Sequence, residues 1–216
     1  MRARCCATCN ARGPHEEALA AFTGALEVRT REAWPQLWAA TKVNVGSTLG
    51  YLFRHGFDLG DLTRAREAYD EALQVYDREA APVDWAAAQN NLGAVLQTLG
   101  QHGFDVAALD KSIEAFEAAR AVYTRRAFPL DWASTYHNAG NTLRLKAALA
   151  NDAAIYGEAA FAFKQALREF DRKATPMQWA LAQNGLGSAL QSLATAESPT
   201  ANLQAAIKAQ REALTV

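Results

Sequence analysis

Cysteine is scarce in this chain of 216 residues. Its three cysteines are Cys5, Cys6 and Cys9, all at the start of the sequence. A structural zinc site needs four ligands, and these usually include a second pair at a distance. With His15 nearby, a partial zinc site is one interpretation of the cluster, and reduced thiols in an unstructured leader are the other. We expect neither a metal nor a cofactor.

The sequence also lacks a positive charge excess, a long apolar run and a secretory signal. Its formal net charge is -1, whereas nucleic-acid-binding domains usually carry a clear basic excess. No apolar run approaches the roughly 20 residues needed to span a bilayer. Arg2 and Arg4 are not followed by the apolar core of a signal peptide. We therefore expect a cytoplasmic protein that binds neither nucleic acid nor membrane.

Proline and glycine are few, and several of them recur at fixed positions of an internal repeat. The repeat is 47 residues long, and its four copies align without insertion or deletion. Each copy has a proline, a tryptophan three residues later and a glycine eight residues after that. These residues are Pro35, Pro82, Pro129 and Pro176, then Trp38, Trp85, Trp132 and Trp179, then Gly46, Gly93, Gly140 and Gly187. Such a repeat predicts stacked helical units.

Two helices are expected in each repeat. The proline suits the first turn of the first helix, because its missing N–H would be unpaired there. The second helix is expected to begin at an Asp or Ser cap, namely Asp58, Asp105, Asp152 or Ser198. It is predicted to run for about twenty residues, with Leu62, Tyr69, Leu73 and Tyr76 on one face in the first repeat. The glycine in the middle of the first helix costs about 1 kcal/mol relative to alanine, which predicts close contact with a neighbouring helix.

The sequence therefore predicts an all-α protein with a leader and one array of helix pairs. Residues 1–13 are expected to be disordered, and residues 14–33 to form the second helix of an incomplete repeat. The repeats follow at about 35–81, 82–128, 129–175 and 176–216. Because no polar cap is recognisable at either end, we expect a piece of a longer array or a truncated product.

One arginine recurs near the end of each second helix, at Arg31, Arg78, Arg125 and Arg172. Each lies seven residues before the next tryptophan, so we expect it to stack on that ring. A shared anion site is the alternative interpretation of the column.

The motifs resemble those of the tetratricopeptide repeat. They include Leu92-Gly93-x-x-Leu96 in the first helix and Ala65-x-x-x-Tyr69-x-x-Ala72 in the second. The resemblance covers residues 16–216 and implies a right-handed α-solenoid of antiparallel helix pairs. The usual period is 34, so either the helices or the turns are longer here. The Pro-x-x-Trp-Ala and Asn-Asn-Leu-Gly pattern is similar to long bacterial arrays, often attached to CHAT or STAND modules, and to kinesin-light-chain repeats.

In that family the first helices line a concave groove, and an asparagine two residues before the glycine can hold an extended peptide. The corresponding positions here are Asn44, Asn91 and Asn138, with Gly185 breaking the ladder in the fourth copy. The neighbouring columns complete the expected groove with Asn90, His137, Asn184, Asn141, Gln97, Arg144 and Gln191. Such a groove is polar and nearly uncharged, and Arg144 near His137 could favour an acidic ligand residue. The alternative is that the asparagines tie each first helix to the preceding repeat.

We therefore expect a module that binds a protein or peptide segment, as part of a larger signalling or regulatory protein. A spacer that associates end to end through its apolar ends is the alternative. An enzyme is not expected, because the sequence has no glycine-rich phosphate loop, metal-ligand set or paired carboxylates on one face.

Overall fold

A computed structural model describes residues 7–196 and 199–214, and the side chains of residues 12–195 and 204–214. Within these ranges the regular structure is entirely helical, as predicted, and no helix there is long and apolar enough to cross a membrane. The helices are α1 (Ala7–Val28), α2 (Pro35–Gly56), α3 (Leu59–Leu73), α4 (Pro82–Gly103), α5 (Val106–Arg120), α6 (Pro129–Ala150), α7 (Ala153–Ala166), α8 (Pro176–Ala196) and α9 (Pro199–Ala213).

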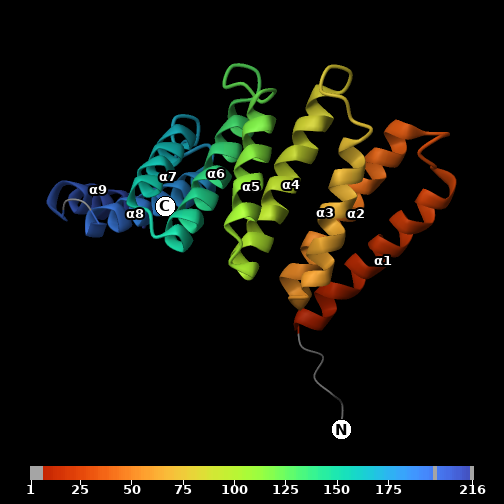
Figure 1. Cartoon of the computed structure of the whole chain (residues 1–216), viewed down its shortest axis with the longest axis horizontal. Coiled ribbons are helices and arrows are strands. Elements are labelled where there is room, and N and C mark those ends of the chain that lie inside the picture. Colours follow the sequence, from red (N-terminus) through yellow and green to blue (C-terminus); the bar gives the residue numbers. More distant parts are fainter. Residues whose placement is uncertain (1–6, 197–198, 215–216) are drawn as a thin grey trace, which may run out of the picture. The chain divides into compact units, whose positions relative to one another are not determined.

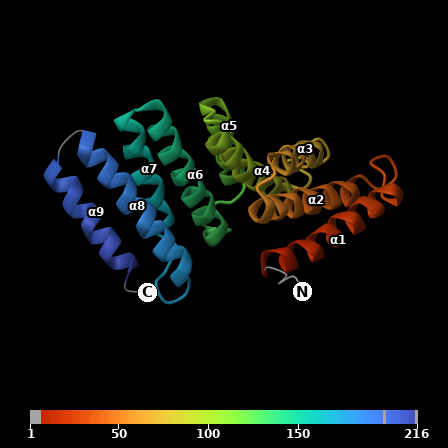
Figure 2. The ribbon, with the colours of Figure 1, turned by 90° about the horizontal axis from the view of Figure 1, so that it is seen from below.

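The chain divides into two compact units, Met1–Leu99 and Gly100–Val216. In the first unit α2 packs against α1 and α3, and the part of α4 before residue 100 joins their core (Figure 1). In the second unit each helix from α5 to α9 packs against the next, and α6 also touches α8 (Figure 2). Each unit therefore holds its helices in chain order. A single array over residues 14–216 stays a prediction.

The predicted helix starts are largely confirmed. The helices α2, α4, α6 and α8 all begin at the repeat proline. The side chains of Asp58, Asp105 and Asp152 cap α3, α5 and α7 by accepting a hydrogen bond from the backbone N–H two residues on. Ser198 lies outside the described residues. The helix α1 differs from the prediction, since it begins at Ala7 and includes Pro14 in its interior.

The second helices are shorter than predicted, with 15 residues in α3 and α5 and 14 in α7. In the first repeat the backbone turns after Ala72, whose carbonyl accepts from the N–H groups of Val75 and Tyr76 at 3.0 and 2.9 Å. Tyr76 stays buried, so the apolar pattern continues although the helix has ended. The extra length of the repeat therefore lies in the 22-residue first helix and in this connection.

A short polar side chain shapes each of these connections. Asp77 accepts hydrogen bonds from the backbone N–H groups of Glu79 and Ala80 at 2.8 and 2.9 Å. Asp171, two repeats later, accepts from the backbone N–H groups of Lys173 and Ala174 at 2.8 and 2.9 Å. At the equivalent positions the hydroxyl oxygens of Thr30 and Thr124 accept one N–H each, at 3.2 and 3.3 Å. These bonds satisfy backbone groups that a helix would otherwise pair.

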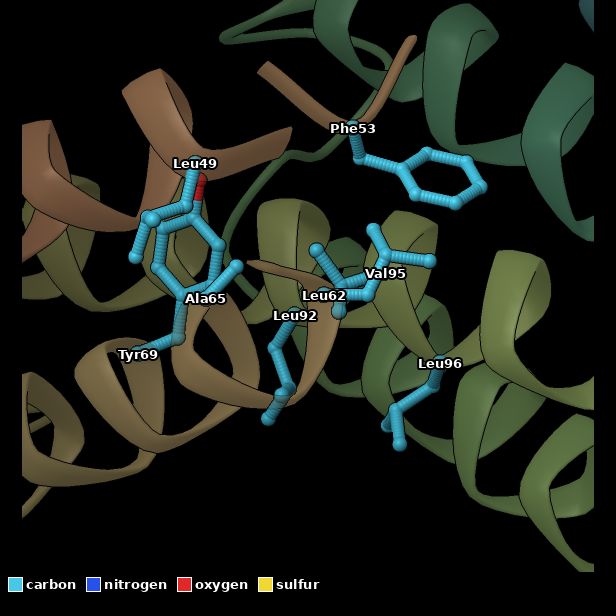
Figure 3. Close-up of a cluster of buried hydrophobic side chains, with 8 residues drawn as sticks. All are labelled: Leu49, Phe53, Leu62, Ala65, Tyr69, Leu92, Val95 and Leu96. Carbon is cyan, nitrogen blue, oxygen red and sulfur yellow. The ribbon is translucent and has the colours of Figure 1, made fainter. Parts of the chain in front are cut away.

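Two of the repeat glycines, Gly46 and Gly140, make room for an aromatic ring from the second helix. A Cβ added at Gly46 would stand 2.8–3.0 Å from the Tyr69 ring, and one at Gly140 would stand 3.1–3.2 Å from Phe163. Figure 3 shows Tyr69 within the buried cluster of the first unit, to which Leu49, Leu62 and Val95 also belong. The predicted close helix contact is therefore confirmed at both glycines.

The arginine column stacks on the tryptophan column as predicted. The guanidinium carbons of Arg31, Arg78, Arg125 and Arg172 lie over the rings of Trp38, Trp85, Trp132 and Trp179 at 5.6, 5.7, 5.8 and 5.7 Å. The interaction joins the end of one repeat to the start of the next. This geometry gives the column a structural role.

Three of the first helices are each followed by a residue with left-handed backbone. Phe57, Phe104 and Asn151 have φ values of 56°, 52° and 52°. Asparagine tolerates this conformation, whereas phenylalanine is strained in it. The preceding glycines, Gly56 and Gly103, are the last residues of their helices rather than the left-handed ones.

Candidate functional site: a cleft along α2 and α4

One stripe of α2 faces one stripe of α4 in the first unit. The α2 stripe runs from Ala40 through Asn44 to Arg54, and the α4 stripe from Asp84 to Thr98, both at helical spacing. Residues near the start of α2 share a depression with residues near the start of α4, and their later residues share another. The two helices therefore run in the same direction, with two depressions along the line between them.

The larger depression, which we call the main cleft, has a volume of about 270 Å³. Its lining combines polar rim residues from α2 and α4 with apolar residues at its base, several of them from the buried cluster of Figure 3. These residues are Ser47, Gly50, Phe53, Arg54, Leu62, Tyr69, Asn91, Ala94, Val95 and Thr98. Asn91 is half-buried at its edge, and Ser47 and Ala94 are exposed. Asn91 belongs to the asparagine column, Ser47 and Ala94 stand at the positions equivalent to Asn141, and Gly50 stands at the position equivalent to Gln97. Three predicted columns of the groove therefore meet at this site.

Tyr69 forms part of the base and is fixed from two sides. Its hydroxyl is 3.0 Å from Oγ of Ser47, and its ring packs over Gly46. Burial raises the pKa of Tyr69, and the hydrogen bond from Ser47 partly opposes that rise. The tyrosine is therefore a neutral hydroxyl at physiological pH. Its hydroxyl is a polar group at the base of the main cleft.

The smaller depression, which we call the minor cleft, has a volume of about 210 Å³ and contains Asn44. Asn44 is exposed there, beside Tyr76 and Asp84. Burial and the negative charge of Asp84 both raise the pKa of Tyr76. Arg54 of α2 lines the main cleft, and Asp84 of α4 lines the minor cleft. The line of the two clefts therefore carries opposite charges near its two ends.

The break in the asparagine ladder has a packing cause in the second unit. A Cβ at Gly185 would stand 2.4 Å from the Phe163 ring, whose side chain is fully buried. The same ring also packs over Gly140. An asparagine at position 185 therefore cannot fit unless Phe163 moves. In the first unit the equivalent residues, Asn91 and Tyr69, line the main cleft together.

The structure turns His137 toward α7 and the segment that follows it rather than leaving it on an open surface. Its ring lies edge-on to Phe163 and Phe170, with centroids 5.6 and 6.4 Å apart, and its Nε2 is 3.1 Å from the amide nitrogen of Asn141. Burial lowers the pKa of His137, so the ring is neutral at physiological pH. The predicted basic spot at Arg144 therefore receives no positive charge from His137.

The other predicted residues occupy less defined positions. Asn90, Gln97, Asn138 and Arg144 are half-buried, whereas Asn184 and Gln191 are exposed. Gln191 accepts a 3.5 Å hydrogen bond from Gln210. Asn184 lines an apolar depression between α8 and α9 with Met177 and Leu181. The structure thus brings Asn44 and Asn91 into clefts between first helices.

Sequence reasoning missed Arg54, Thr98 and Asp84 as residues of the site. Arg54 falls about three turns beyond Asn44 on α2, and Thr98 falls one turn beyond Ala94 on α4, so the helical period could have indicated them. No protein-family model matches the chain, and no curated protein is significantly similar to it. The functional argument therefore rests on the geometry of the clefts.

Proposed function

We propose that the chain is an interaction module that binds an extended peptide along the line of the main and minor clefts. The observation that carries this proposal is the pair of depressions, each holding one member of the asparagine ladder, between two helices that run in the same direction. A carboxamide offers one acceptor and two donors, so it can pair with both the C=O and the N–H of a peptide backbone. Two such groups along one line can therefore hold the backbone of an extended peptide, whatever its side chains.

The length and charge of the site define the ligand further. From Ala40 to Arg54 the α2 stripe extends about 21 Å at 1.5 Å per residue, which matches about six residues of an extended peptide. Asp84 at one end favours a basic group, and Arg54 at the other favours a carboxylate. The preferred ligand is therefore a short segment with a basic and an acidic end.

A selection from a library of random peptides tests this proposal, followed by fluorescence polarisation with the tightest binder. Asn91→Ala removes up to two backbone hydrogen bonds, each worth about 0.5–1.5 kcal/mol, so we expect binding about tenfold weaker. Gln101→Ala removes an exposed amide from the same helix and serves as the matched control. Equal affinity for wild type and Asn91→Ala would contradict the proposal.

A second variant separates loss of binding from loss of stability. Gly50 lines the main cleft, and a Cβ added there meets nothing within 4 Å. Gly50→Gln introduces the residue found at the equivalent positions 97 and 191. We expect it to fill the cleft and abolish peptide binding while raising the melting temperature, because glutamine favours helix over glycine by about 1 kcal/mol. Gly24→Gln on α1, also in open space, should leave binding unchanged.

We also propose that the helix pairs of each unit are antiparallel and belong to one right-handed solenoid. The regular helix starts and the arginine–tryptophan stacking between consecutive repeats support this arrangement. Small-angle X-ray scattering tests it, since a solenoid gives an elongated profile with one fixed maximum dimension. A profile that requires two freely moving bodies would contradict it.

Self-association is a second candidate function, favoured by the apolar depression between α8 and α9. This depression has a volume of about 420 Å³, and three of its side chains, Met177, Leu181 and Leu214, are 68%, 51% and 86% exposed. An exposed apolar patch of this kind marks a contact surface. Light scattering after size exclusion should then show mass that rises with concentration in wild type but not in Leu181→Glu. A constant monomer mass would reject this function.

A further inference from the structure

Four residues that depart from the repeat meet around one cavity in the second unit. Position 120 holds arginine where the other repeats have Leu26, Leu73 and Leu167. Position 136 holds tyrosine where they have lysine or glutamine, and position 139 holds alanine where they have valine or leucine. Position 161 holds phenylalanine where they have alanine, glutamate or lysine. All four residues line a cavity of about 590 Å³ formed by α5, α6 and α7.

The size of the cavity suits a small organic ligand, since ligand pockets are commonly about 300–1,000 Å³. Ala139 and Gly157 leave the space open, and a Cβ added at Gly157 meets nothing within 4 Å. Phe161 is 57% exposed at this site, although large aromatic side chains are usually buried. An aromatic ring bound in the cavity would cover it.

Arg120 gives the cavity a directed hydrogen-bond donor. Its guanidinium lies over the Tyr136 ring at 4.3 Å, and its Nη2 is 3.7 Å from a carboxylate oxygen of Glu117. Nη1 is buried and has no hydrogen-bond partner within the described part of the chain. Burial lowers the pKa of Arg120, although the side chain keeps its charge. A buried donor without a partner is unfavourable, which favours a shift of the guanidinium toward an acceptor bound in the cavity.

We propose that this cavity binds an aromatic monocarboxylate, whose ring packs on Phe161 and Tyr136 and whose carboxylate pairs with the guanidinium of Arg120, a side chain that is 15% exposed. Glu117 and Glu158 also line the cavity, so the ligand's single carboxylate must lie at the guanidinium and away from these two carboxylates, which also disfavour a second negative group. The site is separate from the clefts along α2 and α4, and it does not depend on peptide binding there.

Isothermal titration with 2-naphthoate tests this site, with 2-naphthylmethylammonium as the ligand of opposite charge. Arg120→Leu restores the residue of the other repeats, so we expect a folded protein that melts at the same or a higher temperature. Its affinity for 2-naphthoate should fall about ten- to hundred-fold, because a charge-assisted hydrogen bond is lost. Arg126→Leu removes an exposed arginine from the connection after α5 and should leave the affinity unchanged.

A variant that keeps the charge provides an independent test. Gly157→Leu should block the cavity and abolish 2-naphthoate binding, whereas Gly24→Leu, placed in open space on α1, should not. Three results would each overturn the proposal: no binding of 2-naphthoate to wild type, equal binding to wild type and Gly157→Leu, or equally tight binding of the cationic ligand.

Discussion

The two glycines of α2, Gly46 and Gly50, lie one turn apart and should respond to alanine in opposite directions. Glycine in a helix interior costs about 1 kcal/mol relative to alanine, so both substitutions gain that amount from helix propensity. At Gly50 nothing lies within 4 Å of the new methyl group, and we expect a stabilisation of about 1 kcal/mol. At Gly46 the methyl group would stand 2.8–3.0 Å from the Tyr69 ring.

Tyr69 cannot move away easily, because it is 3% exposed and its hydroxyl pairs with Ser47. Overpacking of this kind costs about 1–3 kcal/mol, and a displaced ring loses a hydrogen bond worth about 1 kcal/mol. After the gain from propensity, Gly46→Ala should destabilise the fold by about 1–3 kcal/mol.

Urea denaturation followed by circular dichroism measures both effects, provided that the m value is unchanged. In a Tyr69→Leu background the penalty at Gly46 should vanish, because the ring contact is gone. If Gly46→Ala raised the midpoint as much as Gly50→Ala, the close packing of α2 on α3 would be refuted.

Three further predictions concern the turns and the broken ladder. Gly185→Asn should lower the melting temperature because of its clash with Phe163, and a Phe163→Leu background should reduce the loss. Backbone hydrogen bonds lower the pKa of Asp77 below its usual 3.8, so its stabilisation is present at neutral pH and lost as the pH falls below about 4. The melting difference between wild type and Asp77→Ala should therefore shrink from neutral to acidic pH, whereas Asp77→Thr, a residue used in the other connections, should melt close to wild type. Phe104→Asn should stabilise the fold by about 1 kcal/mol in urea titrations, because it relieves left-handed strain at a residue that is 76% exposed; an unchanged midpoint would show that the strain is absent.

Much of the fold could be predicted because the repeat places residues with local backbone preferences at fixed positions. Proline at the first helical position, aspartate at the caps and the arginine seven residues before tryptophan all act over short distances, and the structure confirms them. The end of α3 was harder to predict, since Tyr76 continues the apolar period while the backbone has already turned. The left-handed residue was also missed, because Phe57 rather than a glycine adopts that conformation.

The site residues stay a prediction. Asn44 and Asn91 line clefts between α2 and α4, at positions that follow from the helical period, but their part in peptide binding is untested. The burial of His137 depends on where Phe163 and Phe170 pack, and the helical period of α6 alone does not determine their position. The break at Gly185 likewise depends on the Phe163 ring. Which columns stay open is therefore set by the second helix of the same repeat, as for His137, or of the preceding repeat, as for Gly185.

Photo-crosslinking of a bound peptide tests the central claim most directly. A benzoylphenylalanine at Ala94, which is exposed in the main cleft, should capture the selected peptide, and Asn91→Ala should reduce the yield. The same group at Glu114, exposed on α5, serves as the control position. We expect the crosslink at position 94 and not at position 114. Equal capture at the two positions, or capture at 114 alone, would show that the clefts along α2 and α4 do not hold the peptide.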